Sequence, residues 1–251
     1  MSILSKYGIK EVADVTFYEI GADGKPGKPV LYLNTLKVST IESTADATYA
    51  TGGKGNARLI AWDYGKDISV QLTDALFSPK SLSIMMGNGT VKTDGQRSIK
   101  KTVERIATTT KTSDGLDLTW EDPNGKIREI ASPKVYDAKG TEVSTTSGTL
   151  VIGDRYFVVF DQPIESPKEI RIDADAYPGT YYVTGDTFAR AEVDGKDQLF
   201  QFIIPKAKMS AETSISMEAE GDPSTFDMTL DVLRTDDGQM MKLIQYDLPD
   251  A

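Results

Sequence analysis

Phe226-Asp-Met-Thr-Leu-Asp-Val232 alternates apolar and polar side chains without a break. Successive side chains of a β-strand point to opposite faces of its sheet, so this stretch predicts a strand with one dry and one wet face. The wet face would carry Asp227 and Asp231, with Thr229 between them. The same period of two recurs at three other places: Ile68–Leu72, Ile170–Ala174 and Ile215–Ala219.

Denser apolar runs and turn motifs extend this β pattern along the chain. Phe157–Phe160 and Phe200–Ile204 predict strands that are central or covered on both faces. Val12–Ile20 is rich in β-branched and aromatic residues, which favours a strand over a helix. Glycine-containing turns predict hairpin connections at 22–27, 123–125, 138–140, 193–195 and 236–238.

One short helix is predicted at about residues 79–86. Ser78 is a favourable N-cap, Pro79 suits the first helical position, and Gly87 suits the position after the last turn. A helix of about two turns depends on packing for its stability. We expect the side that carries Leu82, Met85 and Met86 to lie over the sheet.

The 251 residues accommodate one large β domain or two small ones. Residues 90–119 are polar, and the pattern from about 120 to 190 is one of short strands with Pro and Gly turns. We therefore expect a mainly β fold, a sandwich or barrel with one flanking helix. Its main domain would comprise residues 1–100 and 191–251, with an inserted β module at 101–190.

Composition narrows the classes of function. The chain has no cysteine and no histidine, so disulfides, thiolate metal sites and catalytic triads that need either residue are excluded. The net charge of −10 disfavours binding to nucleic acid or to anionic membranes. We expect no catalytic residue, metal or cofactor. No secretory signal or membrane-spanning stretch is visible, which predicts synthesis in the cytoplasm.

Several motifs that could bind a ligand have simpler interpretations. Gly52–Asn56 resembles a phosphate loop but lacks the following Lys-Ser/Thr and helix, so we interpret it as a flexible loop. The pairs Asp173/Asp175 and Asp227/Asp231 are interpreted as wet strand faces and not as catalytic or calcium-binding groups. Trp62-Asp-Tyr64 is interpreted as an anchor in a core or an interface.

Several segments, taken in order, resemble the major tail, or tail tube, proteins of phages that infect Gram-positive bacteria. The resemblance covers roughly the first 87 and the last 75 residues and depends on the combination of segments. These segments are Val30–Lys37, Gly52–Asn56, Leu59–Lys66, Asp74–Pro79, Tyr177–Tyr181, Phe200–Lys206, Gly221–Met228 and Met240–Tyr246.

The resemblance implies a β-sandwich subunit that forms hexameric rings, which stack into a tube around a lumen for DNA. It implies a location in the virion tail and contact with the tape measure protein, the tail terminator and, in a contractile tail, the sheath. DNA would be a transient cargo that does not stick. Ile41–Arg58 occupies the place of a loop that reaches the neighbouring ring.

From that placement we predict two sets of residues. Asp227 and Asp231 are the candidates for facing the lumen, where carboxylates would repel DNA phosphates. The candidates for subunit interfaces are Ile41, Thr48, Tyr49, Gly52, Lys54, Asn56, Arg58, Trp62 and Tyr64.

Two other interpretations stay open at this point. The chain could be another β-sandwich virion protein, such as a head decoration, tail terminator or baseplate hub protein. It could also be a carbohydrate-binding β protein, in which Trp62, Trp120 and Tyr181 would line one groove beside paired carboxylates.

Overall fold

The computed structural model describes residues 6–87, 89–93, 95–108, 115–144, 150–213, 215 and 224–246. Over these residues the chain is mainly β with one short helix, as the sequence predicts, and its sheets are antiparallel. The helix is α1 (Pro79–Met85). The strands are β1 (Tyr7–Ile9), β2 (Asp14–Ile20), β3 (Pro26–Leu33), β4 (Leu36–Gly52), β5 (Ala57–Asp74), β6 (Gln96–Ile106), β7 (Thr119–Glu121), β8 (Ile127–Glu129), β9 (Lys134–Tyr136), β10 (Glu142–Val143), β11 (Arg155–Glu165), β12 (Thr180–Ala191), β13 (Asp197–Met209), β14 (Phe226–Val232) and β15 (Lys242–Tyr246).

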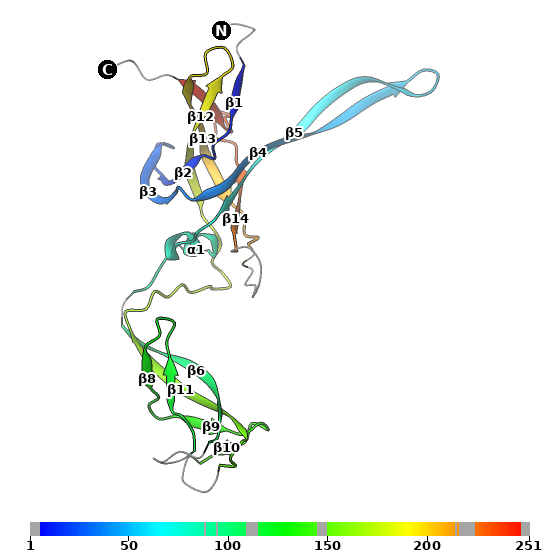
Figure 1. The fold of residues 1–251 in the computed structure, drawn as a ribbon. Coiled ribbons are helices and arrows are strands. Elements are labelled where there is room, and N and C mark those ends of the chain that lie inside the picture. The colour runs from blue at the N-terminus through cyan, green and yellow to red at the C-terminus, as the bar shows by residue number, and fades with distance from the viewer. Residues whose placement is uncertain are drawn as a thin grey trace, which may run out of the picture. The chain divides into compact units, whose positions relative to one another are not determined.

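The chain divides into two compact units, each with its own apolar core (Figure 1). Unit 1 comprises Met1–Val91 and Ile170–Ala251, and unit 2 comprises Lys92–Glu169. These limits differ from the expected module at 101–190. Most of that difference arises because β12 pairs with β2 and β13 and so belongs to the sheet of unit 1.

Unit 1 is built on one rolled sheet with the strand order β3-β2-β12-β13-β14-β5-β4. β1 adds to β12, and β15 adds to β13. The two edge strands, β3 and β4, follow each other in the chain with only Asn34 and Thr35 between them. This two-residue connection brings one end of each edge strand close together. β3 and β4 do not pair, however, so the sheet is not a closed barrel.

The predicted alternation is seen in β14, which confirms the strand at 226–232. Its apolar side chains are buried, whereas Asp227 and Asp231 are exposed. β5 pairs with β14 and buries Val70 and Leu72 in the same core. The core is completed by residues from five other strands and the helix, including Val15, Phe17, Leu33, Leu36, Val183, Ile204, Met209 and Ile84.

The bulge in β13 explains how a proline fits in a central strand. Between Tyr181 and Val183 of β12 the partner residue shifts from Ala207 to Ile204, which leaves Pro205 and one neighbour without a direct partner. Proline has no N–H to donate and is tolerated at such a bulge. β15 pairs with β13 before the bulge and β14 pairs with it after the bulge.

The helix begins as predicted. The Ser81 N–H donates to Ser78 Oγ at 3.0 Å, Pro79 occupies the first turn, and Gly87 follows with φ of 132°. Ile84 and Met85 are buried against the sheet, whereas Leu82 and Met86 are only half-buried. The buried side of the helix is therefore rotated from the predicted one.

Two predictions about the strands are wrong. Residues 170–175 form no strand, so Asp173 and Asp175 do not share a strand face. The turn at 236–238 exists, but β14 and β15 both pair with β13 and not with each other. Phe157–Phe160 lies in β11, which is a central strand, as predicted, because it pairs with β6 on one side and β9 on the other. Val158 and Phe160 are buried, whereas Phe157 is exposed. Of the predicted strand 215–219, residues 216–219 lie outside the described residues.

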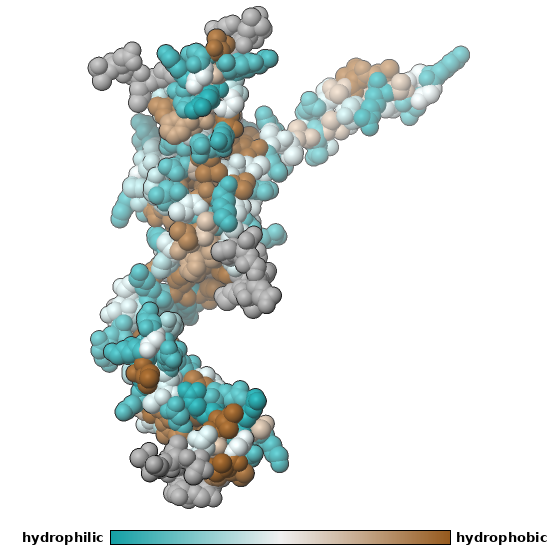
Figure 2. All heavy atoms as spheres, in the orientation of Figure 1, coloured by the Kyte–Doolittle hydropathy of each residue, from teal (hydrophilic) through white to brown (hydrophobic). Residues whose placement is uncertain are grey.

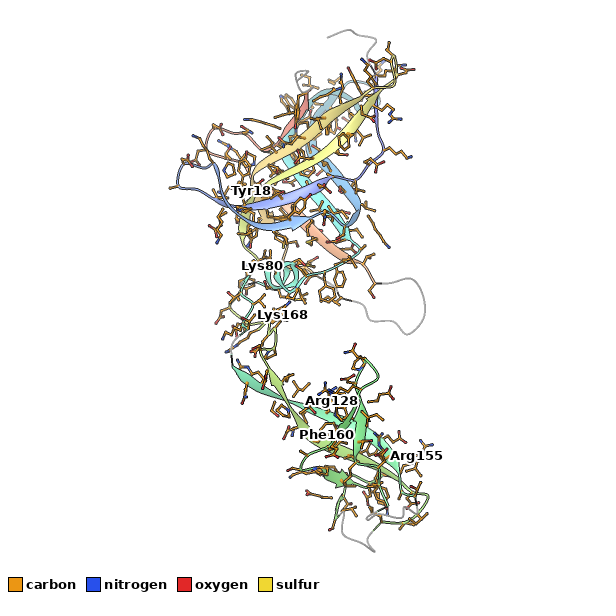
Figure 3. All side chains as sticks on the ribbon, turned by 60° about the vertical axis from the view of Figure 1, so that its left-hand side comes forward. Tyr18, Lys80, Arg128, Arg155, Phe160 and Lys168 are labelled. Carbon is orange, nitrogen blue, oxygen red and sulfur yellow. The ribbon has the colours of Figure 1, made fainter. Side chains whose placement is uncertain are left out.

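Unit 2 contains a sheet of order β10-β9-β11-β6 and a separate β7-β8 hairpin. Trp120 and Phe160 pack together in its core at a ring separation of 6.1 Å. Figure 3 marks Phe160 within this unit. At the base of the unit, Lys92 and Glu169 exchange two backbone hydrogen bonds of 3.0 and 2.9 Å. The two ends of unit 2 are therefore adjacent.

Gly185 of β12 packs closely against the neighbouring strand β13. It lies opposite Phe202 in the β12–β13 ladder, and a Cβ atom at this position would lie 2.1 Å from the buried Phe202 ring. We expect Gly185→Ala to lower the free energy of unfolding by about 1–3 kcal/mol through overpacking. Urea denaturation measures this change. Gly8→Ala is the control, because no atom lies within 4 Å of its added Cβ. Equal stability of the two variants would contradict this packing.

Candidate assembly surfaces

A long hairpin formed by β4 and β5 extends beyond the sheet of unit 1 (Figure 1). The part from residue 46 to 64, called the arm below, is almost entirely solvent-exposed. It begins at a bulge, where Thr44 pairs with Asp67 but Asp46 pairs with Tyr64. Gly65 has a φ of 60° at this bulge, a conformation that glycine adopts without strain. Bulges bend a hairpin and increase its twist, which accounts for the departure of the arm from the sheet.

One face of the arm carries a row of large apolar side chains. Alternate residues of a strand point to the same face, so Ile60, Trp62 and Tyr64 of β5 form one row. Their exposed fractions are 54%, 52% and 58%. Figure 2 shows apolar residues gathered along this hairpin. Three large apolar side chains in one exposed row form a surface suited to contact with another protein.

The opposite face carries a cation. The guanidinium carbon of Arg58 lies 4.0 Å from the centroid of the Tyr49 ring. A second shift in the β4–β5 register, between Ala50 and Thr51, places Arg58 on the face of Tyr49 and not on that of Trp62. Lys54 and Arg58 are the only charged residues between 47 and 62, so the outer part of the arm is basic.

The nine predicted interface residues all lie on this hairpin. Ile41 is in the part of β4 within the sheet, and the other eight are in the arm. Trp62 is not a core residue, so of its two predicted roles only the interface anchor fits its exposure. Gly52–Asn56 forms the tip, and β5 follows directly at Ala57. No helix follows the tip, so this segment lacks the geometry of a phosphate loop.

The two predicted lumen residues lie on a polar face of unit 1. Asp227 accepts a hydrogen bond of 2.6 Å from Thr73 Oγ1. Asp231 lines a shallow depression of about 320 Å³ together with Glu42 and Asp67. Unit 1 contains 25 Asp and Glu against 16 Lys and Arg, so it carries −9 of the net charge of −10. The acidity noted in the sequence is therefore concentrated in one unit.

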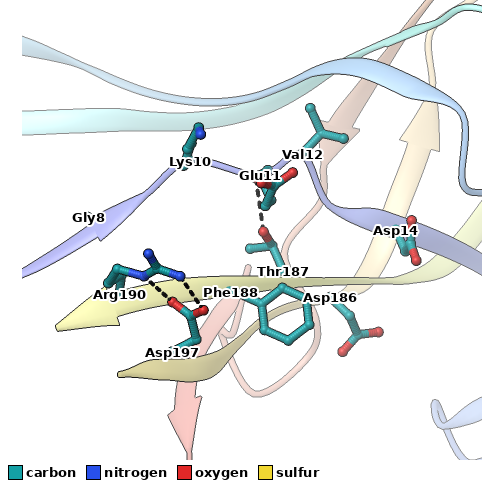
Figure 4. A pocket seen from close by; sticks show the side chains of 10 residues that line it. All are labelled: Gly8, Lys10, Glu11, Val12, Asp14, Asp186, Thr187, Phe188, Arg190 and Asp197. Carbon is teal, nitrogen blue, oxygen red and sulfur yellow. Dashed lines mark hydrogen bonds and ion pairs between the residues drawn. The ribbon is translucent and has the colours of Figure 1, made fainter. Parts of the chain in front are cut away.

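A larger hollow lies between the β1–β2 connection and β12 (Figure 4). Its volume is about 580 Å³, and its lining includes four carboxylates and two cations. Arg190 donates two hydrogen bonds of 2.6 Å to Asp197, and these lower the pKa of Asp197. The sequence patterns missed this hollow because its lining comes from two distant segments, Gly8–Asp14 and Asp186–Asp197.

The aromatic residues named for sugar binding are not arranged for it. Trp120 is buried in the core of unit 2 with an exposed fraction of 9%. Tyr181 is half-buried in unit 1 and packs edge-on against Phe17 at 5.9 Å. Trp62 is exposed on the arm. These placements remove the aromatic groove on which the carbohydrate interpretation depended.

Within the described ranges, no group of three or more acidic side chains could hold a metal ion. No helix in the described part of the chain has the length and hydropathy needed to cross a membrane.

The family model described as the YomU/Tube protein family matches residues 7–244, which include nearly all of both units. No curated protein matches the chain.

The exposure of the arm predicts that it adds little to folding stability. We expect Trp62→Ser to change the free energy of unfolding of the dilute chain by less than about 0.5 kcal/mol, because the side chain has few neighbours to lose. Phe17→Ala in the core should cost about 3–5 kcal/mol. Both values come from urea denaturation at low protein concentration. A large loss in Trp62→Ser would show that the arm packs against its own chain.

Proposed function

The chain belongs to the YomU/Tube protein family, and from this membership we propose that it is the subunit of a phage tail tube. In this proposal six copies form a ring, and rings stack into a hollow tube that conducts DNA during ejection. The protein acts as a structural component and not as an enzyme. It is made in the cytoplasm of the bacterial host and resides in the tail of the virion.

The observation that carries the proposal is the arm. A hairpin whose apolar row is exposed in the single chain gains free energy when a second surface covers it. A copy of the same chain is the partner that a tube requires. When one surface of a subunit binds a different surface of the next copy, the series of subunits does not have to close into a ring. This head-to-tail geometry can therefore produce long assemblies.

The edges of the sheet support lateral assembly. β3 carries Pro26 and Pro29, which lack the N–H needed to pair with another strand. The part of β4 within the sheet, residues 36–44, contains no proline. Among the described residues it pairs with β5 along one edge and with no strand along the other. An edge of this kind can accept a strand from a neighbouring subunit. In a ring, such pairing would remove the open edge.

The polar face supports a role as a conduit. Asp227 and Asp231 are exposed on β14, with Asp67 on the neighbouring strand β5 and Glu42 on β4, the next strand beyond it. Lined along a lumen, these carboxylates would repel the phosphates of DNA and prevent tight binding. DNA would then be a passing cargo, while the lasting partners are other copies and the tape measure, terminator and, in a contractile tail, sheath proteins.

We further propose that unit 2 is an inserted module. Its two ends are joined by paired backbone hydrogen bonds, and it has its own core, so unit 1 does not need it for folding. Its net charge is −1, from 13 acidic and 12 basic residues, which fits a location away from an acidic lumen.

Shortening the arm tests the proposal directly. Deleting Ala47–Thr51 and Arg58–Asp63 leaves Asp46 opposite Tyr64 and keeps the tip turn. We expect the chain to fold normally but to lose tubes, which wild-type protein should form at high concentration in negative-stain electron microscopy. A wild-type protein that stays monomeric at every concentration in sedimentation velocity would contradict the proposed function.

Removal of unit 2 is the complementary prediction. Replacing Lys92–Glu169 with a short Gly-Ser linker should preserve tubes of the same bore, because the surfaces invoked for assembly belong to unit 1. Negative-stain images of the two proteins supply the comparison. Loss of all rings and tubes from a folded deletion variant would show that unit 2 belongs to the tube wall.

A further inference from the structure

Two carboxylates in the larger hollow of unit 1 oppose each other without a cation between their strands. Asp14 of β2 and Asp186 of β12 are direct partners in the antiparallel ladder, and both are exposed. Like charges in this arrangement destabilise a sheet. Repulsion between the two carboxylates lowers the stability of the free subunit. A cation supplied by another molecule would neutralise the pair and remove this repulsion.

The groups around the pair hold it in place but are neutral. Tyr32 Oη donates a hydrogen bond of 3.0 Å to Asp14, and Gln201 Nε2 donates one of 2.7 Å to Asp186. The hydrogen bond to Asp14 and the charges of both carboxylates raise the pKa of Tyr32. Arg190, one of the two cations in the lining, is already engaged by Asp197. The lining as a whole has two more carboxylates than cations.

The walls of the hollow are partly apolar. Val12 and Phe188 line it with exposed fractions of 38% and 52% (Figure 4). The hollow therefore combines an apolar surface with an excess of negative charge. Its volume of about 580 Å³ exceeds what a single side chain fills. Such a surface suits a partner that presents a large apolar side chain beside a cation.

The arm has the complementary chemistry. Its outer part carries Lys54 and Arg58 as its only charges, and the exposed aromatic ring of Tyr49 lies beside Arg58 on the same face. Arg58 stacks on Tyr49, which orients the guanidinium and leaves its N–H groups available for carboxylates. We propose that the hollow of one subunit receives the outer part of the arm of another copy, with Arg58 and Lys54 directed at Asp14 and Asp186.

This inference rests on the proposed self-assembly and names the surface that receives the arm. Arm and hollow are different surfaces of one unit, so the contact is heterologous and each copy can give one arm and receive one. The opposed carboxylates then have a role: they weaken the free subunit slightly and are neutralised when the next copy binds.

A double-mutant cycle on the full-length protein tests the contact. Asp14→Asn/Asp186→Asn removes the charges of the hollow, and Lys54→Gln/Arg58→Gln removes those of the arm. We expect each double variant to raise the concentration needed for assembly at least tenfold in sedimentation velocity. Asp14→Asn/Asp186→Asn should nevertheless unfold at the same or a higher temperature than wild type, because a repulsion is lost. Glu19→Gln and Lys25→Gln, exposed charges outside both surfaces, are the controls and should assemble as wild type does.

The quadruple variant gives the decisive outcome. If the two surfaces contact each other, their effects are coupled, so the quadruple variant should assemble no worse than either double variant. If the two effects instead multiply, so that the quadruple variant needs about a hundredfold higher concentration to assemble, the surfaces act at separate contacts and the inference is overturned. Wild-type assembly of Asp14→Asn/Asp186→Asn would also overturn it, while leaving the tube function intact. A wild-type chain that never assembles would instead refute the proposed function.

Discussion

The pairing of β5 with β14 is the interaction on which the rest of unit 1 depends. It brings the alternating stretch 226–232 next to Val70 and Leu72, so that two strands far apart in sequence bury their apolar side chains in one core. The same register puts Asp227 beside Thr73 on the wet face. Because β5 continues past the sheet into the arm, the core that anchors its inner half also supports the exposed outer half.

Two β-bulges allow strands of this one sheet to change direction or to change pairing partner along their length. The bulge at Gly65 separates a part of β5 that is held by the core from a part that is free to contact another molecule. The bulge around Pro205 divides β13 between two partners, β15 and β14. Such bulges change the direction or the pairing of a strand, because the extra residue is left unpaired and the ladder is locally interrupted.

The charges of unit 1 illustrate a compromise between the stability of the free chain and its association. An excess of carboxylates on exposed faces weakens a folded subunit through repulsion, and the opposed Asp14 and Asp186 are a local example. Exposed apolar residues on the arm likewise add little to folding. Both features are explained if the relevant stable state is an assembly of many copies, as membership in the tube family implies.

The sequence alone determined the β class, the short capped helix and the wet and dry faces of β14. These depend on local periodicity, capping and turn residues, which a linear pattern records. Only the tertiary structure decided that 170–175 is not a strand, that β12 belongs to unit 1 and that Asp14 faces Asp186. Those features depend on which strands pair and in which register, and pairing between distant segments is set by the burial of the whole core and not by local pattern.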